Sequence, residues 1–137
     1  LDPSQRQILL GGHDGHVRVF SDTAKDDDGT DIKSHVFIGP ISVSSMREAK
    51  ITEIAAILDE QTEGLKYEIY AADTAEAARS GTPIVTGSWD GGRNNSQRMR
   101  VRGSAIFVKL IEDRAKLPWA LESLAATLAV DGRSRSR

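Results

Sequence analysis

The clearest pattern of apolar and polar positions lies between Gln97 and Ile111. Its first half alternates three arginines with apolar or small residues, Arg98, Arg100 and Arg102 against Met99, Val101 and Gly103. This period of two is typical of a strand with one solvent-facing and one buried face. After Gly103 the run is almost entirely apolar, as in a strand buried on both faces, and glycine is a natural site for a β-bulge there. We expect one long strand here, the longest of a β-rich domain.

Shorter runs of β-branched and aromatic residues, separated by turn signals, predict further strands. Gln7 to Phe20 is expected to form a hairpin around an Asp-Gly turn. Ile32 to Ser45 has strand character, and Gly39-Pro40 within it marks a bend or a sheet edge, since proline donates no ladder hydrogen bond. Leu65 to Ala71 alternates as a strand, and Thr82 to Gly87 is a short extended piece.

Two segments favour a helix instead. Asp73 to Arg79 is expected to be a short helix, with Asp73 as its cap and Glu76 completing a capping box. Met46 to Glu60 has four apolar residues at helical spacing, Ile51, Ile54, Ala55 and Leu58. Local reasoning leans toward a helix in this second segment, although the pattern does not exclude a strand.

These elements predict the fold class and its extent. We expect an all-β, mainly antiparallel fold, a β-sandwich-like single domain with one short helix, over residues 1–131. The basic end, residues 132–137, is expected to be a flexible tail. Because the sequence opens on Leu-Asp-Pro without methionine, we also expect it to be a fragment of a longer chain.

Composition narrows the function classes. With 39% hydrophobic and 28% charged residues, the 137-residue chain resembles an ordinary globular domain and is long enough to build a real core. No apolar run is long enough to span a membrane, so no membrane partner is expected. The absence of cysteine excludes disulfides and thiolate metal sites.

The net charge of −2 conceals two unlike halves. Residues 1–92 contain 8 Lys and Arg against 16 Asp and Glu, a net charge of −8, whereas residues 93–137 contain 10 against 4, a net charge of +6. A basic stretch is compatible with nucleic acid, but it can equally face an acidic neighbour in an assembly. Charge alone does not decide between these partners.

The sequence offers few residues for catalysis or metal binding. The acidic loop Asp26-Asp27-Asp28-Gly29 suggests a cation, but an EF-hand frame puts Ala24 and His35 where acidic ligands are required, so a solvated loop is favoured. His13 and His16, across a glycine-rich turn, are a weak metal pair. No nucleophile elbow, phosphate loop or zinc-protease motif is present. We therefore expect no enzyme activity, no metal and no cofactor.

Two tryptophans are candidate aromatic contacts. Trp89 lies in a glycine-rich loop, where it can stack on a sugar or a base, although burial against the domain is favoured. Trp119 follows a proline and precedes an apolar segment, Ala120 to Val130, which indicates a core or rim anchor.

Several short motifs are informative as an ordered set. They are Asp27-Asp28-Gly29 with Ile32 and Gly39-Pro40, Asp73 to Ala78, Gly87-x-Trp89, Arg98-x-Arg100-x-Arg102-Gly103-Ser104-Ala105, Trp119 to Glu122, and Gly132-Arg133-x-Arg135. In this order they resemble the C-terminal portion of tail hub or nozzle-type structural proteins of tailed bacteriophages, over most of the chain. The resemblance implies a β-rich domain without catalysis. It also implies that Ala49 to Leu58 is extended, so a strand is expected there in place of the helix.

The function implied by this resemblance is that of a non-enzymatic virion structural module in a phage tail or neck hub or nozzle. Such a module makes subunit contacts in a ring around the DNA path. Its partners would be copies of itself and neighbouring tail or neck proteins, with possible non-specific proximity to DNA. It would be made in the host cytoplasm and reside in the virion tail.

The candidate contact residues follow from this expectation. Arg98, Arg100 and Arg102 would face either acidic groups of a neighbouring subunit or a phosphate backbone. The unlike charge halves would suit head-to-tail contact between copies, the arrangement that closes rings. The alternative is a β-sandwich module that binds carbohydrate through Trp89 or a cation through Asp26 to Asp31.

Overall fold

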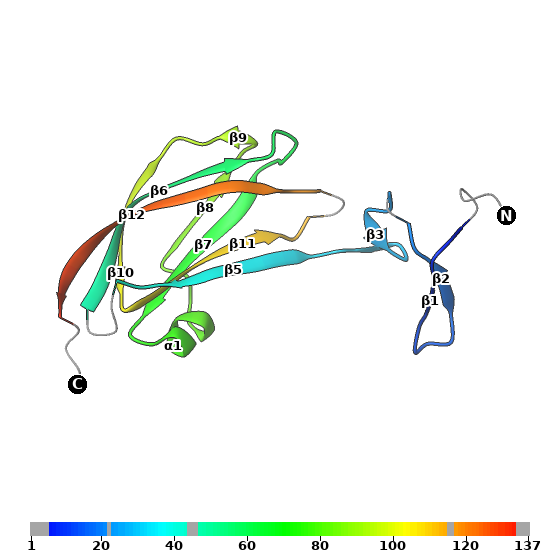
Figure 1. The fold of residues 1–137 in the computed structure, drawn as a ribbon, viewed down its shortest axis with the longest axis horizontal. Coiled ribbons are helices and arrows are strands. Elements are labelled where there is room, and N and C mark those ends of the chain that lie inside the picture. Colours follow the sequence, from blue (N-terminus) through cyan, green and yellow to red (C-terminus); the bar gives the residue numbers. More distant parts are fainter. Residues whose placement is uncertain (1–5, 22, 44–46, 115–116, 134–137) are drawn as a thin grey trace.

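The computed structural model describes residues 6–21, 23–43, 47–114 and 117–133, with side chains described as far as residue 130. Its body is a sandwich of two sheets, and two small hairpins precede the sandwich and lie away from it (Figure 1). The helix of the described residues is α1 (Ala75–Ser80), which is too short to cross a membrane. The expected all-β, mainly antiparallel fold with one short helix is confirmed.

Two antiparallel sheets make the sandwich, and we name each after its central strand. In the β6 sheet, β6 (Arg47–Leu58) pairs with β12 (Leu121–Arg133) on one side, and with β10 (Gln97–Gly103) and the short β9 (Gly92–Arg93) on the other. In the β11 sheet the order is β5 (Ser34–Ile41), β11 (Ala105–Glu112), β7 (Leu65–Ala72) and β8 (Val85–Trp89). The strands predicted at 65–71 and 82–87 correspond to β7 and β8.

The hydrophobic core lies between the inner faces of these sheets. Its buried members are Ala49, Ile51, Ile54, Ala56 and Leu58 of β6, Leu65, Tyr67 and Ile69 of β7, Trp89 of β8, Val101 of β10, and Ile106, Val108 and Leu110 of β11. The outer face of the β11 sheet is covered by α1, where Ala78 packs with Tyr70 and Phe107. Both faces of β11 are therefore buried, which explains its nearly unbroken apolar sequence.

The segment from Gln97 to Ile111 is two strands, so the prediction of one long strand with a bulge is wrong. The chain leaves the β6 sheet after Gly103 and enters the β11 sheet at Ala105. A Cβ atom on Gly103 would lie 3.0 Å from the Ala71 Cβ and 3.1 Å from the Ala72 backbone nitrogen. Glycine is required by this close approach between the two sheets. The longest described strand is β12, with 13 residues.

The region from Ala49 to Leu58 is a strand, as the resemblance implied, and the local preference for a helix is wrong. Between Glu53 and Ile51, β6 has one residue more than the facing stretch of β12, which makes a β-bulge at Thr52. The bulge puts Ile51 and Ile54 on the same buried face although they are three residues apart. A bulged strand has thus reproduced the spacing of a helix.

The predicted cap of the helix is wrong, whereas the predicted position of Gly39-Pro40 at a sheet edge is correct. The cap of α1 is Thr74, whose Oγ1 accepts a hydrogen bond from the Ala77 backbone N–H at 3.2 Å, so Asp73 is not the cap. Gly39-Pro40 lies at a register shift in β5, which is an edge strand of the β11 sheet. Of the two predicted alternatives, a bend or a sheet edge, the sheet edge is confirmed.

The two ends of the chain extend beyond the sandwich core. The predicted first hairpin is confirmed as β1 (Leu9–Gly11) paired with β2 (Val17–Val19), and a second hairpin joins β3 (Asp26–Asp27) to β4 (Thr30–Asp31). We call these two hairpins the N-terminal arm. At the other end β12 continues through Arg133, two residues into the expected tail, and residues 134–137 lie outside the described residues.

Candidate functional site

The outer face of β10 carries the three arginines. β10 is an edge strand on which Arg98, Arg100 and Arg102 are exposed while Val101 and Gly103 are buried, and its ladder to β6 has a register shift between Arg98 and Val101. The expectation that they share one face is confirmed, with successive arginines about 7 Å apart along the strand. We call this set the arginine face.

Across the ladder to β6, the arginine face meets one acidic and one basic residue. In the ladder between β10 and β6, Arg98 is opposite Glu53, which also accepts a hydrogen bond from Ser96, and Arg102 is opposite Lys50. Arg98 and Arg100 make no hydrogen bond or ion pair with the other described residues. Like charges this close repel one another, so the face is suited to an acidic partner or to solvent.

The N-terminal arm has the opposite charge. Residues 21–31 contain one lysine and five aspartates, a net charge of −4. Arg18 of β2 joins the two hairpins, because its guanidinium donates hydrogen bonds to Asp28 Oδ2 at 3.0 and 3.1 Å and to Asp14 Oδ2 at 2.7 Å. Hydrogen bonding from Arg18 lowers the pKa of the Asp14 carboxyl. Asp27 and Asp31 remain exposed on the second hairpin.

The first hairpin of the arm is apolar and uncovered. Six side chains are 51–70% exposed: Ile8, Leu9, Leu10, Val17, Val19 and Phe20. They are consecutive or nearly so along each strand, so both faces of the hairpin are apolar. Isolated two-stranded hairpins are at best marginally stable in water, and this one pairs with no other strand of the described chain.

The two tryptophans have different environments. Trp89 is 1% exposed and stacks on Tyr67 with 4.1 Å between the ring centroids, which confirms burial and removes it as a surface contact. Its indole nitrogen has no hydrogen-bond acceptor among the described residues. Trp119 is half-buried at the rim of the core, where its Nε1–H donates a hydrogen bond to Ser34 Oγ at 2.8 Å. Trp119 is therefore a rim anchor.

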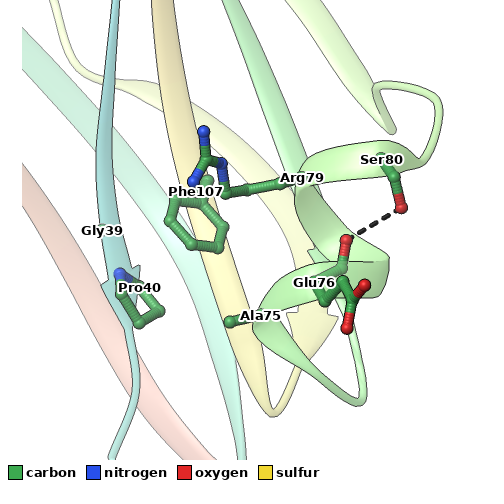
Figure 2. Close-up of a pocket in the computed structure, with 7 residues that line it drawn as sticks. All are labelled: Gly39, Pro40, Ala75, Glu76, Arg79, Ser80 and Phe107. Carbon is green, nitrogen blue, oxygen red and sulfur yellow. Dashed lines mark hydrogen bonds between the residues drawn. The ribbon is translucent and has the colours of Figure 1, made fainter.

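An open depression of about 640 Å³ lies between α1 and β5. Figure 2 shows Arg79 reaching from α1 toward Phe107, and Ser80 turned back to donate a hydrogen bond to the Glu76 backbone oxygen at 2.8 Å. The Arg79 guanidinium carbon is also 5.4 Å from the centre of the Phe37 ring. The described lining contains no histidine, and the hydroxyl of its one serine is engaged in the bond to Glu76.

Metal ligands do not gather in the part of the chain that the structure describes. No group of three or more His, Asp or Glu residues there could hold a metal ion. His16 is 3.5 Å from Asp14, which is itself held by Arg18, and the Asp28 carboxylate is also bound by Arg18. The acidic loop is thus partly neutralised by an arginine of its own chain.

Comparison with known proteins finds no matching family model and no similar curated protein.

Sequence reasoning placed the arginine face correctly and missed the arm as a candidate contact. The signal was available, because Ile8-Leu9-Leu10 and Val19-Phe20 are consecutive apolar residues in strands too short to be covered on both sides. The sequence reasoning treated these residues as ordinary hairpin strands. Their exposure follows from the position of the arm outside the sandwich (Figure 1).

Proposed function

We propose that this chain is a non-enzymatic structural module of a tailed-phage virion, in a tail or neck hub or nozzle, which makes subunit contacts in a ring around the DNA path. The observation that carries the proposal is the N-terminal arm, with six exposed apolar side chains on a hairpin outside the sandwich. Exposed apolar groups gathered in this way mark protein contact sites. A subunit can retain such a hairpin because a neighbour covers it.

The motifs behind the phage assignment have structural positions in the fold, which is compatible with a family of structural proteins. Gly39-Pro40 lies at the irregularity of an edge strand, and Gly103 lies where the chain crosses between the sheets. Trp89 of the Gly87-x-Trp89 motif is in the core. Gly87 pairs with Tyr67, whose ring occupies the space that a Cβ atom on Gly87 would fill.

The alternative functions have less support. Sugar binding through Trp89 requires an exposed ring, and this ring is buried against Tyr67. Cation binding at Asp26 to Asp31 competes with Arg18, which already binds the Asp28 carboxylate. A phosphate backbone remains the second candidate partner for the arginine face, because a ring around DNA brings basic side chains near phosphates.

Expression of the gene together with its genomic neighbours, followed by electron microscopy, tests the proposal. We expect ring-shaped or tail-like particles that contain this chain, identified by mass spectrometry of the purified particles. A gene neighbourhood without virion components, together with absence of the chain from any particle, would contradict it. The control is the same set of genes without this one, which should give no complete particles.

A further inference from the structure

We propose that the N-terminal arm of one copy docks on the β6 sheet of the next copy, with the acidic hairpin β3–β4 against the arginine face and the apolar hairpin β1–β2 against the exposed end of β12. The inference rests on the proposed function, because it names the surfaces through which the subunits contact one another. Its partner is a second copy of this chain.

The two surfaces are complementary in charge. The arm segment 21–31 carries a net charge of −4, and Asp27 and Asp31 are exposed on its hairpin. On the sheet, Arg98 and Arg100 have no partner among the described residues. Opposed charges at an interface guide association and fix its register, and they also relieve repulsion within each surface.

The two surfaces also share an apolar component. Leu128 and Val130 of β12 are 40% and 51% exposed, although their ladder partners Ile51 and Ala49 are completely buried. These two side chains are on the core face of the sheet, at an end where no facing strand covers them. Since β12 is an edge strand, its outer backbone groups are also free to pair with an added strand.

The basic and apolar groups lie at the same end of the β6 sheet. In the strand ladder, Arg102 is opposite Lys50, and Lys50 is opposite Ala129. The next row contains Val130. With neighbouring strands about 4.8 Å apart, the end of the arginine face and the exposed end of β12 are separated by about 10 Å across the sheet. The arginines project from the outer face of the sheet, and Leu128 and Val130 project from its core face, so one arm contacts both sets by folding around this end of the sheet.

The positions of the two surfaces exclude docking within one copy and favour a second one. Figure 1 shows the N-terminal arm at one end of the long axis of the molecule and the C-terminal end of β12 at the other. Complementary surfaces at opposite ends of a subunit produce head-to-tail contacts, which close into a ring when the rotation between subunits permits. This geometry gives a physical reason for the exposed hydrophobic hairpin.

A charge exchange between two variants tests the contact. The first variant reverses the arm with Asp27→Lys and Asp31→Lys, and the second reverses the sheet with Arg98→Glu and Arg100→Glu. Each alone should weaken self-association by about tenfold or more in sedimentation velocity at low salt, because like charges then meet. An equimolar mixture should restore association, since each reversed arm then meets a reversed sheet and each native arm a native sheet.

The control variant carries Glu60→Lys and Glu63→Lys, two exposed positions in the turn between β6 and β7, and should associate like the unmodified chain. Thermal unfolding of each variant checks that the sandwich is intact. A mixture that stays dissociated, a chain that is monomeric at about 100 µM before any change, or normal association of both reversed variants would overturn the docking.

Normal association of both reversed variants separates the two proposals. Rings that still form from these variants would contradict the arm contact and would remain consistent with the proposed function. Conversely, restored association in the mixture, without any virion gene nearby or any particle, would support the arm contact and contradict the virion assignment.

Discussion

Arg114 binds the buried carboxylate of Glu112 at two points. The Arg114 Nη2 is 2.7 Å from Glu112 Oε2, and the Arg114 Nε is 2.9 Å from Glu112 Oε1. The same guanidinium donates to the backbone oxygens of Glu63 and Gly64, so it ties the end of β11 to the turn between β6 and β7. Glu112 is 3% exposed, and an unpaired carboxylate there would be costly.

Replacement of Arg114 by glutamine should destabilise the fold at pH 7, because the buried carboxylate loses its charged partner. In the native chain, hydrogen bonds from Arg114 lower the pKa of Glu112. The stability contributed by this pairing is therefore present above the unfolded-state pKa of about 4.3 and is lost as pH falls through the lower folded-state pKa. Urea unfolding of both chains at pH 7 and pH 4 measures the difference.

The gap between native chain and variant should shrink at the lower pH, because Glu112 in the variant can be buried as a neutral acid. Asp113→Asn is the matched control. Its partner is Lys66 at 3.4 Å, and both side chains are about half exposed, so it should cost less than about 1 kcal/mol. An equal loss in both variants would contradict the role of burial at Glu112.

The helical spacing of apolar residues in β6 shows why sequence patterns were insufficient for this fold. Ile51 and Ile54 fall on one face of a helix, but a bulge at Thr52 also puts them on one face of a strand. The bulge depends on pairing with β12, about 75 residues away, as the hydrogen bond from Thr52 Oγ1 to the Thr127 backbone oxygen illustrates. Local propensity cannot contain that information.

The sequence likewise predicted only a part of the candidate site. Alternation along β10 was sufficient to place Arg98, Arg100 and Arg102 on an exposed face. The sequence did not predict that the chain changes sheet after Gly103, because a continuous strand and two strands joined at a glycine have the same apolar pattern. The partner surface on the arm also needed the structure, since exposure depends on what the rest of the fold leaves uncovered.

Replacement of Gly103 by valine should destabilise the fold by about 1–3 kcal/mol, because the added side chain would overlap the Ala71 and Ala72 positions. Gly11→Val provides the matched control. Gly11 is also in a strand, and a Cβ atom there would have no neighbour within 4 Å. Thermal midpoints of both variants measure the effect. Equal midpoints would show that the crossing between the sheets tolerates a side chain.

The fluorescence of Trp89 should change when the protein unfolds and should not change when sugars are added. Replacement by alanine should cost about 3–5 kcal/mol, since Trp89 fills the core and stacks on Tyr67. Tryptophan fluorescence titrated with mono- and disaccharides should show no saturable change in a variant that retains only Trp89, made with Trp119→Phe. A saturable change in that variant would mean that the Trp89 ring is accessible. The reciprocal variant, Trp89→Phe, reports on the half-buried Trp119.

The arginine face should bind duplex DNA weakly and without sequence preference. Three phosphate contacts predict a slope of about −2.7 for log affinity against log salt, so binding should largely vanish at physiological salt.

A triple variant, in which glutamine replaces Arg98, Arg100 and Arg102, should weaken ring or tail assembly, because an acidic neighbour loses its partner. DNA retention by any particles that still assemble should be unchanged. Fluorescence anisotropy with a labelled duplex and electron microscopy of the particles measure the two effects. Tight DNA binding at physiological salt that the triple variant abolishes would assign these arginines to phosphate, because contact with an acidic subunit surface provides no reason for it.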